Sequence, residues 1–391
     1  MRDTSLAYRN YAALILMLGY AANFTDRQIM AILVEPIKTE FALSDSEVGL
    51  LNGLPFAFFY VVLGVPIARL ADRGNRRNIV AISIASFSAM TVFCGLSANM
   101  WQLFLARMGV AVGEAGTTPA AHSMISDLFP PSERARALGI YSMGVSLGIL
   151  IGFMIGGWIV HLWGWRAALL TAGVPGLVLA AVVRLTVAEP PRRQFEAATA
   201  SETQPTFLAS LEWLWSQRSA RHLAMAGICY AVAAASMVSW GPAFFSRSFG
   251  MGPASSGTAL AFIYGILGAG GAYLAGTVSD RLGRLDQRWY LWVLAIAAIL
   301  SAPFAAGAFL APNPVVSLVC YAVPAVAVTA VSGPLFASAY LLVPADRRAV
   351  TSAIFFCSWD FSAPALVRSW SASSAISIDL RGGLSLCAGR C

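Results

Sequence analysis

Residues 68–77 read Ala-Arg-Leu-Ala-Asp-Arg-Gly-Asn-Arg-Arg, and residues 276–284 read Gly-Thr-Val-Ser-Asp-Arg-Leu-Gly-Arg. Each stretch lies between two long apolar runs and places an Asp-Arg pair ahead of a further arginine. A short polar loop that recurs in this setting indicates two homologous halves that both cross a membrane. The repeat therefore predicts an all-α polytopic membrane protein built from two related helical bundles.

The composition of the chain is that of a protein whose solvent is lipid. Of its 391 residues, 58% are hydrophobic and 12% are charged, which is about half the charged fraction of a soluble domain. The net charge of +7 does not predict nucleic-acid binding, because the arginines lie in short loops and form no single basic face. The six cysteines show no CxxC pair and no metal-ligand spacing, so we expect neither a metal nor a disulfide framework.

Apolar runs of about 20 residues, the length that spans a bilayer, predict ten clear transmembrane helices. We expect a six-helix bundle at 1–187, a cytoplasmic linker at 188–221 with a short interfacial helix at 207–215, and helices seven to ten at 222–348. The predicted spans are 11–34, 48–68, 79–97, 101–123, 137–161, 166–187, 222–245, 256–278, 290–310 and 315–343.

The apolar pattern ends in residues 349–391. No run of spanning length follows Phe356, and the segment is rich in serine, arginine and cysteine. Two more helices are needed to complete a second six-helix bundle. We therefore expect an aberrant tail at 349–391, with a reading frame that is truncated or shifted near 353–357.

Arginine placement predicts the orientation of the chain. The loops after the second, fourth, sixth and eighth spans carry most of the arginines, so the positive-inside rule places these loops and the N-terminus in the cytoplasm. The single lysine, Lys38, and the excess of alanine favour a GC-rich bacterial genome. We therefore expect a multi-pass protein of the bacterial inner (plasma) membrane.

Several motifs carry a family resemblance. Residues 276–284 fit the G-x-x-x-D-R-x-G-R pattern of the major facilitator superfamily, whereas 68–77 has Ala68 and Asn75 where glycines are usual. Residues 20–27, Tyr-Ala-Ala-Asn-Phe-Thr-Asp-Arg, and the string Gly-Glu-Ala at 113–115 resemble its Spinster-like branch. The resemblance implies a major facilitator fold of two six-helix bundles, here with the second incomplete. It also implies transport of lysolipids or sphingoid phosphates, as in eukaryotic members, or proton-linked transport, as in bacterial ones.

Two adjacent charges, Asp26 and Arg27, lie about two-thirds of the way through the first span. A charge near the bilayer centre costs at least about 2.5–3.5 kcal/mol, so both side chains should face the bundle interior or water. Asn23 lies three and four residues earlier and extends this polar stripe. We expect Asn23 and Arg27 to bind substrate or pair with charge. The alternative is a buried ion pair that only fixes helix packing.

Arg107 and Glu114 lie seven residues apart on one face of the fourth span. The resemblance implies that the first and fourth helices line the transport cavity. A carboxylate that moves between a dry pocket and an arginine changes its protonation. Glu114 and Asp26 are therefore the predicted proton-coupling residues, with Glu114 favoured, and Arg107 is a predicted charge partner. The alternative is a static clamp between Arg107 and Glu114.

The two Asp-Arg loops are predicted to form a cytoplasmic gate. An acid near a helix N-terminus is favoured by about 0.3–1 kcal/mol. We expect Asp72 to meet the start of helix eleven, and Asp280 to meet the start of helix five near Ala137, when the cytoplasmic side is closed. The predicted gate residues are Asp72, Arg73, Arg76, Arg77, Asp280, Arg281 and Arg284.

Glycines recur at four-residue spacing in the fifth span, a pattern that allows close helix contact. They also resemble the antiporter-associated motif of the superfamily, with Phe153 in place of its usual proline. We predict a helix-packing role for Gly144, Gly148, Gly152 and Gly156.

These features favour a proton-coupled secondary active transporter that moves an amphipathic or lipid-like anion by alternating access, because arginines in a cavity suit an anionic head group. The alternatives are a carrier of drugs or small solutes, such as sugars or carboxylates, and a transport-inactive ligand-binding membrane protein. No HExxH, nucleophile elbow or P-loop lysine is present, so we expect no enzyme, no ATP-driven pump and no cofactor. The expected partners are membrane lipids, protons and a small amphipathic substrate, bound by a monomer.

Overall fold

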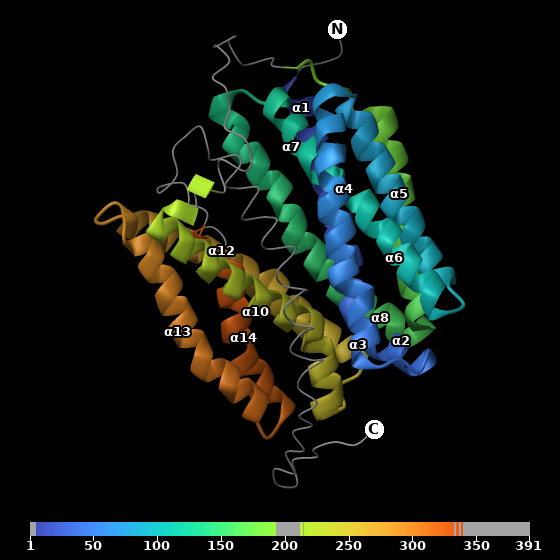
Figure 1. Cartoon of the computed structure of the whole chain (residues 1–391), viewed down its shortest axis with the longest axis vertical. Helices are drawn as coiled ribbons and strands as arrows, with labels where there is room; N and C mark the ends of the chain where they lie inside the picture. The colour runs from blue at the N-terminus through green and yellow to red at the C-terminus, as the bar shows by residue number, and fades with distance from the viewer. Residues whose placement is uncertain (1–4, 193–211, 214, 332–333, 336–337, 339–391) are drawn as a thin grey trace.

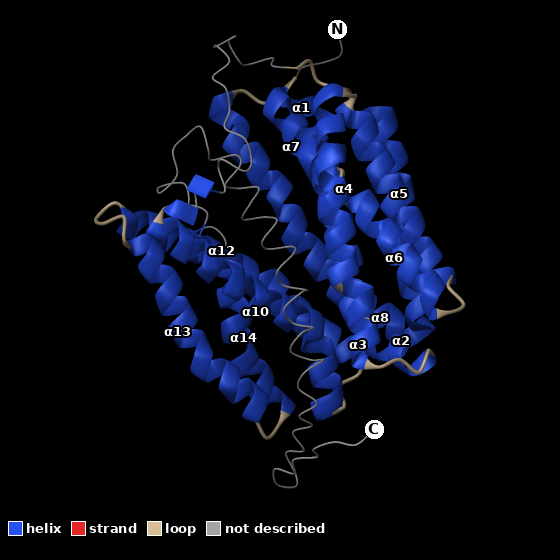
Figure 2. Ribbon diagram, in the orientation of Figure 1, coloured by secondary structure: helices blue, strands red, loops and turns tan. Residues whose placement is uncertain are grey.

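The computed structural model describes residues 5–192, 212–213, 215–331, 334–335 and 338. Every element within these residues is a helix, which confirms the predicted all-α class (Figure 2). The helices fall into two groups that stand side by side in Figure 1. The first group comprises α1 (Leu6–Ile32), α2 (Val34–Glu40), α3 (Asp45–Asn52), α4 (Leu54–Arg73), α5 (Arg76–Leu96), α6 (Met100–Glu114), α7 (Thr117–Leu128) and α8 (Pro131–Thr186).

The second group follows the linker region. Its helices are α10 (Arg218–Phe249), α11 (Pro253–Leu260), the π-helix η1 (Ala261–Leu267), α12 (Gly268–Gly283), α13 (Trp289–Leu310) and α14 (Pro314–Ala330). The predicted helix at 207–215 and the predicted tail at 349–391 lie outside the described residues, apart from 212–213 and 215. The proposed division of the chain into bundles and linker therefore stays a prediction.

Six helical stretches of the described chain are long and apolar enough to cross a membrane, fewer than the ten predicted spans. The helix α1 is not among them, because Asp26, Arg27 and their polar neighbours lower its hydropathy. The predicted span 101–123 is divided into α6 and α7 at residues 115–116, and each part is short. The helix α8 is one of the six stretches, but it contains two predicted spans, 137–161 and 166–187, which Gly164 separates.

Gly164 breaks the helical path of α8. Its φ of 81° lies in the left-handed region, and its ψ of 173° is far from helical. Residues with a Cβ rarely adopt this conformation, whereas glycine does so at little cost. The turn at Gly164 therefore lets one continuous element form both the fifth and the sixth predicted spans.

The two ends of the molecule differ in how the groups meet. We call the end that carries both Asp-Arg loops the hinge end, and the other the outer end. In Figure 1 the groups approach each other at the outer end and diverge toward the hinge end. At the approach a Cβ added to Gly157 of α8 would lie 2.4 Å from the carbonyl oxygen of Pro253 in α11. Trp158 also donates from Nε1 to Thr258 Oγ1 at 3.1 Å.

The repeated glycines of α8 lie against α1. A Cβ added to Gly144 would lie 2.6 Å from the Met17 carbonyl oxygen, and one added to Gly148 would lie 2.4 Å from that of Ala21. Such distances leave no room for a methyl group, so α1 can approach α8 only because these positions are glycine. Gly152 and Gly156 continue the contact toward Thr25 and Ile29. This packing holds α1, and the charges that it carries, at a defined depth in the first group.

Candidate functional site

Asp26 of α1 is buried in the first helical group with both carboxylate oxygens occupied. Its Oδ2 accepts a hydrogen bond from Arg107 Nη1 of α6 at 2.5 Å. Its Oδ1 accepts one from Thr91 Oγ1 of α5, also at 2.5 Å. All three side chains are buried. A buried ion pair is tolerated only when further hydrogen bonds satisfy the charged groups, and Thr91 supplies one of them here.

The neighbouring residue Arg27 forms a second ion pair with α6. Its Nε and Nη2 both lie 2.8 Å from Glu114 Oε2. Glu114 is fully buried, and its Oε1 has no hydrogen-bond partner within the described residues. The Arg27 side chain is 24% exposed. Arg27 is therefore the most exposed of the four charged side chains Asp26, Arg27, Arg107 and Glu114.

The two pairs cross between the helices, so the acid of α1 meets the arginine of α6 and the arginine of α1 meets the acid of α6. A direct clamp between Arg107 and Glu114, one of the alternatives left open above, is not what the structure contains. Arg107 is instead paired with Asp26, and Glu114 is paired with Arg27. We call Asp26, Arg27, Arg107 and Glu114 the charge cluster.

Aromatic rings surround the charge cluster. The Arg27 guanidinium lies 5.0 Å from the centre of the Tyr60 ring and 5.5 Å from that of Phe56. Arg107 lies 5.0 Å from the same Phe56 ring. Such contacts favour a cation by about 0.5–2 kcal/mol. The sequence pattern did not separate these two rings from their apolar neighbours, because only the packing of α4 against α6 brings them to the arginines.

Two buried polar residues complete the site. Asn23 lies on α1 one turn before the charges and is buried, as its spacing from Asp26 predicts. Thr91 was not singled out from the sequence. It is one polar residue in a helix of mixed composition, and its role depends on α5 packing beside α1.

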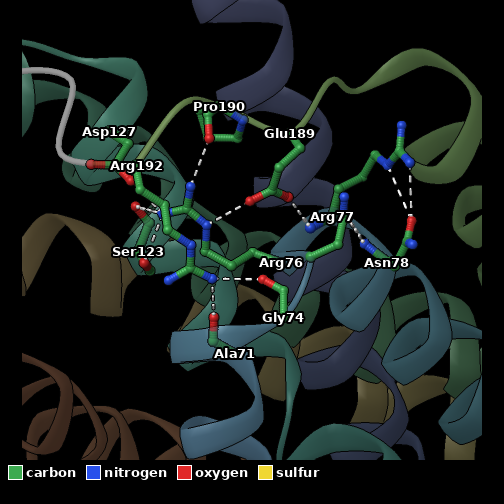
Figure 3. Close-up of polar contacts among 11 residues, drawn as sticks. Ala71, Gly74, Arg76, Arg77, Asn78, Ser123, Asp127, Glu189, Pro190 and Arg192 are labelled. Atoms are coloured by element: carbon green, nitrogen blue, oxygen red, sulfur yellow. Dashed lines mark hydrogen bonds and ion pairs between the residues drawn. The ribbon is translucent and has the colours of Figure 1, made fainter.

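The first Asp-Arg loop forms a cluster of its own, centred on Arg76 (Figure 3). Arg76, whose side chain is 1% exposed, donates to Glu189 Oε1 and to the Pro190 carbonyl oxygen, each at 2.8 Å. It also forms an ion pair with Asp127 of α7 and donates to Ser123 Oγ at 3.0 Å. We call these five residues the Arg76 cluster.

The segment that follows α8 returns to this loop. The backbone N–H of Arg77 donates to Glu189 Oε2 at 2.8 Å. Arg192 donates to the carbonyl oxygens of Ala71 and Gly74 at 2.9 and 2.6 Å (Figure 3). Arg76 and Arg77, two of the arginines predicted to form a gate between bundles, thus join parts of the first group. The side chains of Asp72 and Arg73 lie outside the described part of the chain, as does the predicted partner of Asp72.

The second Asp-Arg loop has a different environment. Asp280 Oδ1 accepts a hydrogen bond from the Tyr290 hydroxyl at 3.0 Å, ten residues further along the chain. The meeting of Asp280 with the start of helix five near Ala137 is predicted for a closed cytoplasmic side, and it stays a prediction, because the groups diverge at the hinge end (Figure 1). Arg281 and Arg284 are exposed, and neither has an ion pair among the described residues.

The outer end carries an ion cluster that sequence analysis did not identify. Arg247, near the end of α10, lies 2.5 Å from Glu35 Oε1 and 2.6 Å from Asp45 Oδ1, both in the first group. Lys38 lies 2.7 Å from the same Asp45 oxygen. Arg247 therefore joins the two helical groups by charge. We call these four residues the outer ion cluster.

A second arginine at the outer end stays within one group. Arg166 lies 2.6 Å from Glu40 Oε1, and Trp165 donates from Nε1 to Glu40 Oε2 at 2.5 Å. The hydrogen bonds from Trp165 and Arg166 hold the pKa of the Glu40 carboxyl below its ordinary value. This pair ties α2 to α8 and does not reach the second group.

Comparisons with known proteins agree with this architecture. A model of the Major Facilitator Superfamily matches residues 16–366. An MFS-type efflux pump of Mycolicibacterium smegmatis is 32% identical over 349 residues, covering 89% of this chain and 80% of the pump. Protein spinster homolog 1 of Rattus norvegicus is 30% identical over 325 residues, covering 78% of this chain. The chain spans 61% of the length of that relative.

Solved structures give the same result. The crystal structure of a bacterial homolog of the human lysosomal transporter Spinster, in an inward-facing and unoccupied conformation, superposes with a TM-score of 0.85 at 30% identity. The superposition covers 93% of this chain and 82% of that chain. A D-xylose–proton symporter superposes with a TM-score of 0.70 at 17% identity, which is a likeness of fold alone.

Proposed function

The chain belongs to the Major Facilitator Superfamily and is a Spinster-like, multi-pass membrane transporter, and from this premise we propose that it is a proton-coupled secondary carrier working by alternating access. The membership confirms the family resemblance of the Asp-Arg loops and of residues 20–27. The observation that carries the proposal is the charge cluster, in which two buried carboxylates each depend on one arginine.

The charge cluster can link an anion to a proton. A buried carboxylate that loses its arginine is left as an unpaired charge, which costs several kcal/mol. An anionic solute that reaches the exposed part of Arg27 competes with Glu114 for the guanidinium. Glu114, fully buried, then favours its protonated form. Anion binding and proton uptake at Glu114 therefore promote each other, and Asp26, paired with the buried Arg107, is the second carboxylate that we propose takes up a proton.

Alternating access is supported by the uneven contact between the two groups. Their polar contacts, among the described residues, lie at the outer end, where Arg247 and Trp158 reach across. Such contacts must break when the outer end opens. We propose that the hinge end faces the cytoplasm of a bacterial inner membrane. In this proposal the bundles at 1–187 and 222–348 move about the linker at 188–221.

For the substrate we propose an amphipathic or lipid-like anion. Arg27 suits an anionic head group, and the rings of Phe56 and Tyr60 beside it suit an apolar part of the same molecule. The likeness to the mycobacterial efflux pump favours a second candidate, the export of drugs or other small solutes. A neutral or cationic drug cannot form an ion pair with the Arg27 guanidinium. Transport of an amphipathic anion should therefore depend on Arg27, whereas transport of such a drug should not.

Transport into proteoliposomes under an imposed pH gradient tests the proposal. Lysophosphatidylglycerol and a cationic dye are the two probes, and we expect gradient-dependent uptake of the former. Glu114→Gln, which cannot ionise, should abolish the dependence on the gradient. Glu133→Gln is the matched control, because Glu133 pairs with Arg9 away from the charge cluster and should keep full coupling. Uptake by the unaltered protein that ignores the gradient would eliminate proton coupling.

A further inference from the structure

The Thr91 hydroxyl lies between two oxygen atoms. Its Oγ1 is 2.5 Å from Asp26 Oδ1 and 3.0 Å from the carbonyl oxygen of Phe87, one turn earlier in α5. A threonine in a helix commonly donates to the carbonyl of residue i−4, so the contact with Phe87 is ordinary. The contact of Thr91 with Asp26, a buried carboxylate on another helix, is not part of this common helix pattern.

A hydroxyl has one proton to donate and two lone pairs that accept. While Asp26 is ionised, Thr91 donates to Oδ1 and Arg107 donates to Oδ2, so both oxygens are satisfied. When a proton is placed on Oδ1, the Thr91 hydroxyl can rotate to donate to the Phe87 carbonyl oxygen. Its freed lone pair then accepts the Asp26 O–H. Only the hydroxyl rotates, and Oδ2 still accepts from Arg107.

Both protonation states of Asp26 are thus fully hydrogen-bonded in one backbone arrangement. An unsatisfied polar group in a buried site costs about 1–3 kcal/mol, so a partner that could only donate would oppose the protonated state. Resting on the proposed function, we infer that Thr91 is the positioning residue that allows Asp26 to exchange its proton. The proton is carried on Oδ1, the side that faces α5.

The other charged and titratable groups described near Asp26 do not supply this exchange. Arg107 of α6 is a permanent cation and donates only. Glu114, further along α6, is paired with Arg27 of α1. Cys94 lies one turn beyond Thr91 on α5 and is buried, and its Sγ is a weak donor and acceptor. Of the two described side chains that hydrogen-bond to Asp26, Arg107 and Thr91, only Thr91 can both donate and accept.

Infrared difference titration of the purified protein in detergent tests the inference without a substrate. The band of the protonated Asp26 carboxyl is identified by its loss in Asp26→Asn. In Thr91→Val, which keeps the shape but lacks the hydroxyl, the ionised carboxylate loses a donor. We expect the pH midpoint of the band to rise by about one unit, and the band to move to higher wavenumber. Thr91→Ser should restore both.

Thr171→Val is the matched control, because Thr171 donates to backbone carbonyls of its own helix and has no hydrogen bond to a carboxylate among the described residues. It should leave the Asp26 band unchanged. If Thr91→Val does not stay monodisperse in detergent, Thr91→Cys, a weak donor, should give a smaller rise in the midpoint. A midpoint that neither substitution moves, or an Asp26 band that never appears, overturns the inference.

The two proposals fail separately. If uptake by the unaltered protein does not depend on the pH gradient, the proposed proton coupling is wrong, whatever the infrared titration shows. An unmoved Asp26 band in Thr91→Val removes the role of Thr91 alone, even where transport follows the gradient.

Discussion

The two Asp-Arg loops share a residue pattern, and the structure gives them different surroundings. Arg76 and Arg284 occupy the same place in the pattern, four residues after the aspartate. Arg76 is enclosed by Asp127, Glu189 and backbone carbonyls (Figure 3), whereas Arg284 is exposed. The difference arises because the segment after α8 folds back on the first loop and brings Glu189 to it. A repeated motif therefore indicates common ancestry. The role of each copy depends on which other segments of the chain pack against it.

Removing the first arginine is expected to have the largest effect. Arg76→Gln removes the buried cation that Asp127 and Glu189 share, and breaking a buried pair costs about 3–5 kcal/mol. Arg284→Gln makes the same change at an exposed position and should alter the free energy of unfolding by less than about 0.5 kcal/mol. SDS titration of both variants in detergent measures the difference. Equal losses in the two variants would contradict the distinction between the loops.

The two ends of the molecule also differ, and removing an ion pair at the outer end should have a smaller effect, on the separation of the two helical groups. Arg247→Gln removes the cation that joins the two groups at the outer end and should favour separation there by about 1 kcal/mol, since the pair is partly exposed. Distances between spin labels on α3 and α11 report the change. Arg166→Gln is the matched control, because its exposure is 39% against 37% for Arg247 and its pair lies within one group. If the distances between the spin labels are the same in both variants, the outer ion cluster has no gating role.

The smallest expected effect is a pH dependence at Glu40. Its pKa is held below the ordinary value of 4.5 by hydrogen bonds from Trp165 and Arg166. A lowered pKa means that the ionised form stabilises the fold above pH 4.5, and that this contribution is lost as the pH falls through the lowered value. Thermal unfolding measured between pH 6 and 3 should therefore show a slightly shallower decline in Glu40→Gln. An identical decline in both proteins would show that Glu40 contributes nothing.

Much of the charge cluster could be predicted from the sequence, because charge in an apolar span is costly wherever it lies. Asp26, Arg27, Arg107 and Glu114 stand out against their neighbours for that reason. Their pairing could not be predicted, since it depends on how α1 and α6 are placed side by side. The direct pair of Arg107 with Glu114 is local in sequence, yet each of the two residues pairs with a residue of α1 instead.

Residues that act through contact with a distant segment gave no local signal. Glu189 lies in a polar stretch that has the composition of a linker, and only the fold shows it beside Arg76. Arg247 looks like one basic residue at a helix end, and its two carboxylates lie about 200 positions earlier in the chain. Thr91 is one polar residue among several in α5.

The sequence by itself determined the class of the protein, the repeat of its halves and the identity of the buried charges. These depend on hydropathy and on the cost of charge in lipid, which are properties of each residue and its neighbours in the chain. Only the tertiary structure decided which acid meets which arginine, that Thr91 contacts Asp26, and that one Asp-Arg loop is enclosed while the other is exposed. Those outcomes depend on distances of a few ångströms between separate helices, which the packing of the glycines of α8 against α1 helps to set.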